Sequence, residues 1–336
     1  MHHQIVTQIF NQRVGIYFVI LLYLKKFILS RMNIRFFVSV LWLLSFSTSF
    51  SQNLLPKELI VAIGHTKMDK KGVEIDKQLQ EYLAKKLNMP VKVTYPKDIF
   101  AILEKIDSNA VHVVDINPFG YVMASLNDKV DVLAIRGNKN REVETYNSCI
   151  VVGAKSPIKK IDDIKKLGAK SEMVFVHAAS TSGHLVPRLY LNSIKIDVEI
   201  IFKSISFKGT HLNVIEYIKN TPNAVGACAY SFLQDQIKSG KFDEKDFRVL
   251  WISSQIPHGP VAVLKDLEPN FRKKLQEAYL AIPTEAPELW KMIVANWNAK
   301  LEDTTYIAGS DKAFDALRNI TNQAEDLILI LNFYRE

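Results

Sequence analysis

The sequence predicts an α/β protein built from two lobes. From Leu59 onward, short apolar runs alternate with amphipathic helical stretches, which is the pattern of mainly parallel sheets covered by helices. The chain has 336 residues, enough for two compact domains, and its 48% hydrophobic and 23% charged residues are ordinary for a globular protein.

The first series of elements is expected to form lobe 1. Its strands are predicted over residues 59–64, 91–94, 111–116 and 132–135, and its helices over 74–87 and 99–106. The helix at 74–87 places Ile75, Leu79 and Leu83 on one face, so we expect it to cover a sheet.

A second series is expected to form lobe 2. Its strands are predicted over residues 149–153, 173–176, 199–202, 224–229 and 248–252, and its helices over 183–192, 212–219 and 231–238. A strand at 260–264 and helices at 270–282, 286–297 and 311–333 then follow.

We expect the chain to cross twice between the lobes, near residues 146–153 and 253–260. Lobe 1 would then be discontinuous, comprising residues 53–147 and 256–336, and lobe 2 would comprise residues 148–255. Because helix N-termini from both lobes would point into the cleft between them, that cleft is the expected ligand site.

Most of the formal charge of +8 comes from the first 51 residues. They hold five basic residues and no acidic ones: Arg13, Lys25, Lys26, Arg31 and Arg35. The remainder has 38 basic against 35 acidic residues and no clustered basic stretch. This balance argues against a nucleic-acid-binding protein.

Residues 32–51 have the three parts of a secretory signal peptide. A cationic start at Arg35 precedes a short apolar run over 36–46 and small residues ending at Ser51, so cleavage would leave Gln52 first. The apolar run is too short to span a bilayer comfortably. No cysteine stands at the cleavage site, which excludes lipid attachment there.

Residues 1–31 contain a second apolar run, from Val14 to Leu24. A start codon placed too far upstream explains this segment best. The alternative is a membrane anchor, which eleven apolar residues make the weaker interpretation, because a spanning helix needs about 20.

The chain has two cysteines, Cys149 and Cys228. An exported protein can pair them if the fold brings them together. Both lie in apolar, strand-like runs, and this favours two buried free thiols that pack as small hydrophobic groups.

The stretch from Phe175 to Pro187 has the chemistry of an anion cradle. Ser180 can cap a helix that starts here, and Thr181 and Ser182 offer hydroxyl donors. Gly183 would let a ligand approach the backbone closely. Since serine and threonine cap many helices that bind nothing, a plain helix cap is the alternative.

Signatures of common enzymes are missing from the sequence. It has no Gly-x-Ser-x-Gly elbow, no Walker-type loop, no His-Glu-x-x-His and no Cys-x-x-Cys. Five histidines of the mature chain are not spaced like a metal site: His65, His177, His184, His211 and His258. Missing motifs do not exclude an enzyme, but they favour a protein without catalysis, metal or cofactor.

Five stretches together resemble one family. Ser180-Thr-Ser-Gly183, followed by Leu-Val-Pro187, resembles the phosphate-gripping loop of periplasmic substrate-binding proteins for phosphonate, phosphite and phosphate. The stretches 115–121, 146–152, 207–211 and 249–257 also resemble family segments, in the expected order over roughly residues 55–285.

This resemblance to PhnD-like proteins of ABC-type importers implies a type II periplasmic binding fold with a ligand cleft between two hinged lobes. It also implies a small phosphorus oxyanion as ligand, a permease as partner, a periplasmic location and a monomer. Rival interpretations are a stand-alone sensory or scavenging module of this fold, or an enzyme built on it, for which His177 and His184 beside the hydroxyl loop are the suggestive feature.

The resemblance also assigns further ligand contacts. Tyr121 would reach the ligand and His211 would bond a phosphate oxygen, while His177 would add a donor or merely end a strand. Taken alone, Tyr121 could equally be a core-edge aromatic residue, and His211 an exposed turn residue.

Three departures from the family pattern bear on the ligand. Ile99 stands where a ligand-facing tyrosine is common, and Leu212 and Ala224 stand where acidic residues are common. Because acidic residues can recognise an aminoalkyl group, these losses weaken the case for an aminophosphonate. They leave phosphate, phosphite or a neutral phosphonate.

Overall fold

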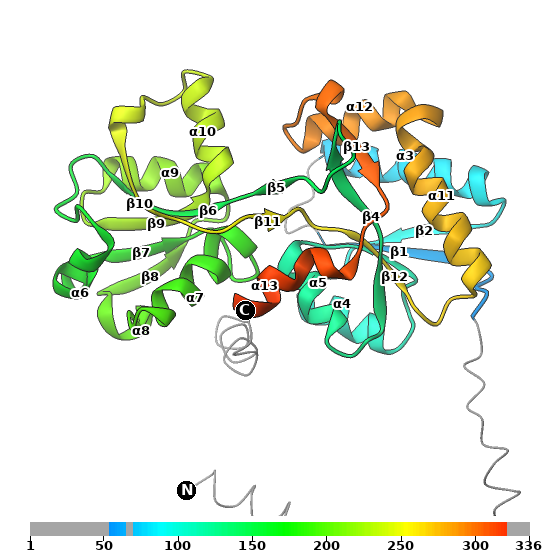
Figure 1. Ribbon diagram of the computed structural model, residues 1–336, viewed down its shortest axis with the longest axis horizontal. Coiled ribbons are helices and arrows are strands. Elements are labelled where there is room, and N and C mark those ends of the chain that lie inside the picture. Colours follow the sequence, from blue (N-terminus) through cyan, green and yellow to red (C-terminus); the bar gives the residue numbers. More distant parts are fainter. Residues whose placement is uncertain (1–53, 65–69, 321–336) are drawn as a thin grey trace, which may run out of the picture. The chain divides into compact units, whose positions relative to one another are not determined.

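The computed structural model describes residues 54–64 and 70–320, which contain two mixed β-sheets covered by helices on both faces (Figure 1). The α/β class is confirmed. The predicted signal peptide at 32–51, the segment at 1–31 and the end of the helix predicted at 311–333 lie outside the described residues. We call the two sheets with their helices lobe 1 and lobe 2.

Lobe 1 has a six-stranded sheet in the order β13-β4-β12-β3-β1-β2. The strands are β1 (Leu59–Ile63), β2 (Val91–Thr94), β3 (Val113–Asp115), β4 (Val130–Asn138), β12 (Val261–Leu264) and β13 (Thr304–Ile307). One face carries α3 (Lys70–Leu87), α11 (Pro269–Glu285) and α12 (Pro287–Asn296), and the other carries α4 (Ile99–Asp107), α5 (Pro118–Ser125) and α13 (Asp315–Ile320).

Lobe 2 has a five-stranded sheet in the order β10-β6-β9-β7-β8. The strands are β6 (Ser148–Gly153), β7 (Glu172–Phe175), β8 (Ser204–Phe207), β9 (Ala224–Ala229) and β10 (Phe247–Ile252). One face carries α9 (His211–Asn220) and α10 (Tyr230–Lys238), and the other carries α6 (Ile164–Leu167), α7 (Val186–Ser193) and α8 (Val198–Ile201).

The chain passes between the two sheets twice, through β5 (Thr145–Tyr146) and β11 (Ile256–Pro257). These two short strands pair antiparallel, with Ile256 opposite Tyr146, and form a hinge sheet of their own (Figure 1). Both crossings therefore run side by side, which is an arrangement that allows two lobes to rotate about a common hinge.

The strand directions put the connecting loops of each lobe at one edge. In lobe 1, β1, β2 and β3 run parallel, and in lobe 2, β7, β8 and β9 run parallel. Ligands of open α/β sheets bind beyond the carboxyl ends of such strands. The segments after β3, β7 and β8 are therefore the places to look for a site.

Three elements differ from the sequence prediction. The strand predicted at 199–202 is wrong, because Asp197 accepts hydrogen bonds from the amides of Glu199 and Ile200 and caps helix α8 there. The strand of this region is β8, which starts at Ser204. Helix α5 and strand β13 were not predicted. Asn117 caps α5 by accepting from the Gly120 amide at 2.7 Å.

The two cysteines are buried, as predicted, and the fold also brings them together. Cys149 on β6 lies directly opposite Cys228 on β9, and their Sγ atoms are 3.5 Å apart. This proximity could not be predicted, because the pairing of β6 with β9 has no local signal in the sequence.

The turn between β7 and α7 is built from local constraints. Ser180 caps it by accepting from the Gly183 amide at 3.1 Å, and residues Thr181–Leu185 form a π-helical turn before α7. Pro187 has no amide hydrogen to offer to the Gly183 carbonyl, which instead accepts from the Val176 amide at 3.0 Å. The turn is thereby fastened to the end of β7.

Gly183 lets the turn pack closely against the end of β7. A Cβ atom at this position would lie 2.2 Å from Val176 Cγ2 and 2.8 Å from Ser180 Oγ. The space that the missing side chain leaves is therefore filled by the protein itself. Any larger residue would push the turn away from β7.

His184 supports the same turn from inside. Its side chain is fully buried between the rings of Phe175 and Phe207, at centroid distances of 4.5 and 5.2 Å. Its Nδ1 lies 2.6 Å from the Ala178 carbonyl oxygen, so Nδ1 must carry the proton. Burial lowers the pKa of His184 to about 3. The imidazole is thus a neutral structural group.

Helices α5 and α7 share an apolar contact between the lobes. Phe119 and Met123 of α5 pack with Leu185 and Leu189, and all four side chains are buried. Burying apolar surface contributes about 25 cal/mol per Å². This contact therefore favours the arrangement in which the two helices touch.

Tyr121 lies in the core of lobe 1. Its side chain is fully buried against Phe314, and its hydroxyl donates to Asp311 Oδ1 at 2.7 Å. Of the two sequence interpretations, the structure favours the core residue, because both the ring and the hydroxyl are engaged within lobe 1.

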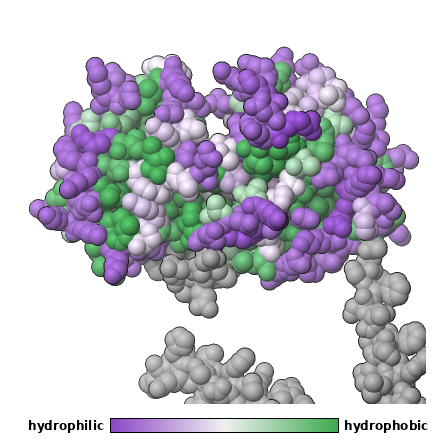
Figure 2. Space-filling model, viewed as in Figure 1, coloured by the Kyte–Doolittle hydropathy of each residue, from purple (hydrophilic) through white to green (hydrophobic). Residues whose placement is uncertain are grey.

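The face drawn in Figure 2 is hydrophilic along much of its rim, with apolar areas between. The most exposed large apolar side chains are Leu55, Leu126 and Ile200, which belong to different elements. Such dispersed apolar residues are normal on a protein surface. Within residues 54–64 and 70–320, no helix has the length and apolar character needed to cross a bilayer.

The buried histidine predicts a specific loss of stability in acid. The pKa of His184 is about 6.5 when the chain is unfolded and about 3 when folded, so the unfolded chain binds the extra proton. Its contribution is complete above pH 6.5 and is lost as the pH falls toward 3, by up to about 1.4 kcal/mol per pH unit. Denaturant titrations at several pH values between 7.5 and 4.5 measure the free energy of unfolding at each pH. This free energy should depend less steeply on pH in His184→Gln than in the unaltered protein. Equal slopes would contradict this assignment.

Tyr121→Phe should lower the stability of the fold and leave ligand affinity nearly unchanged. The variant keeps the buried ring and removes the hydroxyl that donates to Asp311, which costs about 1 to 2 kcal/mol of unfolding free energy. Denaturant unfolding measures this loss. Ligand affinity should stay within a factor of about two, and a tenfold loss of affinity with unchanged stability would restore Tyr121 as a ligand residue.

Candidate functional site

The lobe 2 edge gathers most of the residues predicted from the sequence. The segment after β7 supplies His177 and the Ser180–Gly183 turn, and the segment after β8 supplies His211. The Gly209 amide donates to the Val176 carbonyl at 2.7 Å, which ties the second segment to the first. Gly209 has a φ of 81°, a backbone conformation that glycine adopts without strain.

His211 is held in one tautomer. Its Nδ1 accepts from the Ala229 amide at 3.1 Å, so a neutral imidazole carries its proton on Nε2. Burial, helped by the nearby His177, lowers the pKa of His211 to about 4. The residue begins α9, whose first turn is capped by Thr210. At neutral pH, His211 therefore offers one N–H donor.

His177 is also neutral at pH 7, because burial lowers its pKa. The effect of His177 on the pKa of His211 shows that the two rings are near one another. An anion at this edge would thus meet neutral donors and helix N-termini, without a fixed positive charge from these histidines.

The two hydroxyls of the turn face lobe 1 and the hinge. Thr181 Oγ1 accepts from the Phe119 amide at 3.2 Å and donates to Asn117 Oδ1 at 3.4 Å. The Ser182 side chain lies within hydrogen-bonding reach of the Tyr146 hydroxyl. Thr181 and Ser182 therefore connect the turn to residues that line the adjoining pocket.

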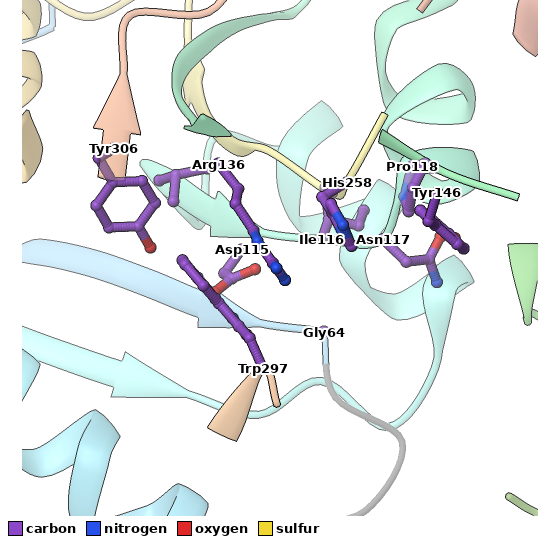
Figure 3. A pocket seen from close by; sticks show the side chains of 12 residues that line it. Gly64, Asp115, Ile116, Asn117, Pro118, Arg136, Tyr146, His258, Trp297 and Tyr306 are labelled. Carbon is purple, nitrogen blue, oxygen red and sulfur yellow. The ribbon is translucent and has the colours of Figure 1, made fainter. Parts of the chain in front are cut away.

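This pocket lies at the lobe 1 edge and has a volume of about 220 Å³ (Figure 3). Most of its lining comes from strand ends and the loops that follow them. The residues are Gly64, Asp115, Ile116, Asn117, Pro118, Arg136, Tyr146, His258, Gly259, Val261, Trp297 and Tyr306. Asn117 and Tyr146 belong to the pocket and also contact the Ser180–Gly183 turn, so the two halves adjoin.

One end of the pocket is charged. Arg136 donates through Nε and an Nη atom to both oxygens of Glu144, at 2.7 and 2.6 Å, and lies over the Trp297 ring at 5.4 Å. Figure 3 shows Asp115 on the same side as Arg136, Trp297 and Tyr306. This end of the pocket therefore holds a carboxylate and a guanidinium together.

The other end is formed by the hinge. Tyr146 of β5 stacks on His258, which follows β11, with ring centroids 4.8 Å apart. Burial raises the pKa of Tyr146 to about 12, and burial together with the charge of Arg136 lowers the pKa of His258 to about 3. Both rings are uncharged at neutral pH. They form a flat wall of the pocket that carries the Tyr146 hydroxyl and the ring nitrogens of His258.

Not all of the residues singled out by sequence belong to this arrangement. Tyr121 lies in the lobe 1 core, and Gly183 is occupied by internal packing. Ala224 starts β9, opposite Glu172 at the start of β7, whereas the candidate site lies at the other end of these strands. Ala224 is therefore roughly 17 Å along β9 from the end of the strand that faces the site. The lost acidic residue at 224 therefore says nothing about the ligand, and that part of the sequence argument is wrong.

Several pocket residues were missed by the sequence analysis. Asn117 had a readable signal, because an asparagine before a proline at a strand end is a typical helix cap. Arg136, Trp297 and Tyr306 had none, since their proximity depends on β13 pairing with β4 over a long sequence separation. Among the described residues, no cluster of His, Cys, Asp or Glu is arranged to hold a metal ion.

Solved structures share this fold at low sequence identity. PhnD1 from Prochlorococcus marinus in complex with methylphosphonate has a TM-score of 0.62 at 20% identity, covering 81% of this chain and 99% of that one. A binding protein component of an ABC phosphonate transporter from Pseudomonas aeruginosa has a TM-score of 0.63 at 17% identity, covering 82% and 88%. XAC2383 from Xanthomonas citri, bound to ATP, has a TM-score of 0.65 at 15% identity, covering 84% and 100%.

The type II periplasmic binding fold predicted from the sequence is thereby confirmed. Residues 68–306, more than half of the chain, match the family described as "ABC transporter, phosphonate, periplasmic substrate-binding protein". The chain belongs to this family of periplasmic solute-binding proteins of ABC importers.

Proposed function

We propose that this protein binds a small organophosphonate across the two halves of the site. The phosphorus oxyanion lies at the lobe 2 edge, where Thr181 and Ser182 supply hydroxyls, the turn that Ser180 caps supplies backbone amides, and His211 supplies its Nε2–H. His177 adds a neutral donor beside them. The observation that carries the proposal is that the segments bearing these donors follow β7 and β8 at their carboxyl ends and are joined by the hydrogen bond from the Gly209 amide to the Val176 carbonyl.

The adjoining pocket supports a ligand larger than phosphate or phosphite. Its volume of about 220 Å³ is space beyond that taken by the phosphorus group itself. A tetrahedral oxyanion held at the lobe 2 edge would leave this space empty. A phosphonate carries an organic substituent that can extend from the phosphorus atom into the pocket, past Asn117 and Tyr146.

The lining of the pocket offers an acceptor to a substituent that carries hydrogen-bond donors. Asp115 lines the pocket, and a carboxylate has acceptor sites for several donors at once. An amino or hydroxyl group at the end of a short substituent would find an acceptor in Asp115. This makes an aminophosphonate a better candidate than the sequence departures alone suggested.

In this proposal the protein acts without catalysis, as a monomer that delivers its ligand to a permease. His184, which the enzymatic alternative would need, is a buried support of the turn. Ligand that bridges the lobes would stabilise the closed arrangement by mass action. An ATPase and a permease encoded beside this gene would fit an importer component, whereas their absence would favour a stand-alone sensory or scavenging module.

The lobe 2 donors should determine affinity for the phosphorus group. The best ligand is first identified by calorimetry with phosphate, phosphite, methylphosphonate, 2-aminoethylphosphonate and sulfate. Ser182→Ala and His211→Asn each remove a donor to a charged acceptor, which contributes roughly 1.5 to 3 kcal/mol. Each variant should therefore bind that ligand about 10 to 100 times more weakly.

Ser180→Ala is the matched control for these variants. It removes the hydroxyl that caps the turn, which should cost about 1 kcal/mol of stability while affinity changes far less than for Ser182→Ala. Unchanged affinity in both Ser182→Ala and His211→Asn would mean that the turn is only a helix cap. Sulfate binding as tight as the best phosphonate would overturn the ligand class.

Asp115→Asn should change the choice between phosphonates. Without the carboxylate, the protein should lose about tenfold in its preference for 2-aminoethylphosphonate over methylphosphonate, because one partly exposed charge pair is removed. Competition calorimetry with both ligands measures this ratio. Asp131→Asn, on strand β4 and outside the pocket, should leave the ratio unchanged. An unaltered ratio in Asp115→Asn would exclude the proposed orientation of the substituent.

A further inference from the structure

Cys149 and Cys228 are placed as the two halves of a disulfide. They lie directly opposite one another in the antiparallel pair of β6 and β9, and their Sγ atoms are 3.5 Å apart. Opposite residues in such a pair have Cα atoms about 4.5 or 5.5 Å apart, and disulfides join Cα atoms about 4.4 to 6.8 Å apart. The register of this pair therefore puts its Cα separation within the range that disulfides join.

The pairing is specific within this chain. These two residues are its whole complement of cysteines, and the fold brings them face to face across a separation of 79 residues. Both side chains are fully buried. A neighbouring thiol from another molecule cannot reach either sulfur in the folded protein, so each has one partner within reach.

We propose that the exported protein carries a disulfide between Cys149 and Cys228. Its family is periplasmic, and the periplasm is an oxidising compartment in which disulfides form and persist. The proposal does not depend on which ligand the cleft binds.

The reaction is a thiol–disulfide exchange with a disulfide-bearing oxidoreductase of that compartment. One cysteine loses its proton, and its thiolate attacks the disulfide of the oxidant, forming a mixed disulfide and releasing one thiol of the oxidant. The second cysteine, as thiolate, then displaces the other sulfur of the oxidant. The protein loses two electrons and two protons, and the oxidant is reduced to two thiols.

Oxidation must precede the completion of folding. In the folded chain the Cys149 sulfur and burial together raise the pKa of Cys228, so the attacking thiolate is scarce as well as inaccessible. The bond therefore forms while β6 and β9 are still open to the oxidant. For the same reason, a reductant outside the folded protein cannot reach the bond once it is made.

The bond would cross-link the strands on which the lobe 2 edge is built. Ser148, next to Cys149, donates its hydroxyl to the Ser182 carbonyl at 2.7 Å. Ala229, next to Cys228, donates its amide to His211. The closed loop of the chain includes β7, β8, α7 and α9, which is most of lobe 2.

The test uses the full chain exported in a bacterial host and purified from the periplasm without reductant. The protein is unfolded in guanidinium chloride with iodoacetamide, with and without prior reduction, and its mass is measured. The proposal expects no alkylation without reduction and two alkylated cysteines after it. Two alkylated cysteines without reduction, or a covalent dimer on a non-reducing gel, would overturn it.

A stability measurement on refolded protein gives a second readout. Unfolded protein is refolded once with oxidised glutathione and once with dithiothreitol. The oxidised form should melt roughly 10 °C higher, because a cross-link closing a loop of this length restricts the unfolded chain. Equal melting temperatures for material shown by mass to be oxidised and reduced would contradict the stabilising role.

Variants separate the disulfide from the packing of the thiols. Cys149→Ala combined with Cys228→Ala should melt at one temperature under both refolding conditions. Each single variant should show one alkylated cysteine without reduction. Should these variants fail to fold, the thiol count on the unaltered chain still decides the proposal.

Discussion

The hydrogen bond from the Val176 amide to the Gly183 carbonyl fixes the position of the lobe 2 site. The Gly183 carbonyl can accept this bond because Pro187, four residues later, has no amide hydrogen to donate to it. The turn of Thr181–Leu185 is π-helical and packs on the end of β7, where Gly183 leaves no gap and His184 fills the interior. π-helical turns are rare and are found frequently at functional sites.

Local chemistry made the centre of this site predictable from the sequence. Ser180 before a helical pattern reads as a cap, and the structure has it as one. Most strands of both sheets could also be placed, because buried parallel strands are short apolar runs. The strand at 199–202 was misplaced because α8 is a four-residue helix whose apolar residues resemble a strand. Only the cap at Asp197 distinguishes it.

The pocket was beyond sequence reasoning for a physical reason. Arg136 and Trp297 meet across more than 150 positions of chain, through a sheet whose outermost strand, β13, returns after two long helices. Tyr121 illustrates the opposite failure. A tyrosine near a strand end is typical of a ligand-binding residue. The hydroxyl of Tyr121, however, donates to Asp311, which comes from the far end of the chain, and this bond holds it within lobe 1. Neither outcome has a local signal.

The apolar contact between α5 and α7 bears on the speed of the hinge. Any rotation that parts the two helices exposes Phe119, Met123, Leu185 and Leu189 to water before new contacts replace them. That exposure raises the barrier to opening by the same amount whichever ligand occupies the cleft. Ligand exit is therefore slowed by side chains that do not line the pocket. The residence time of the ligand then depends partly on residues that play no part in recognising it. Two ligands of unequal affinity can then share this part of the kinetic barrier to release.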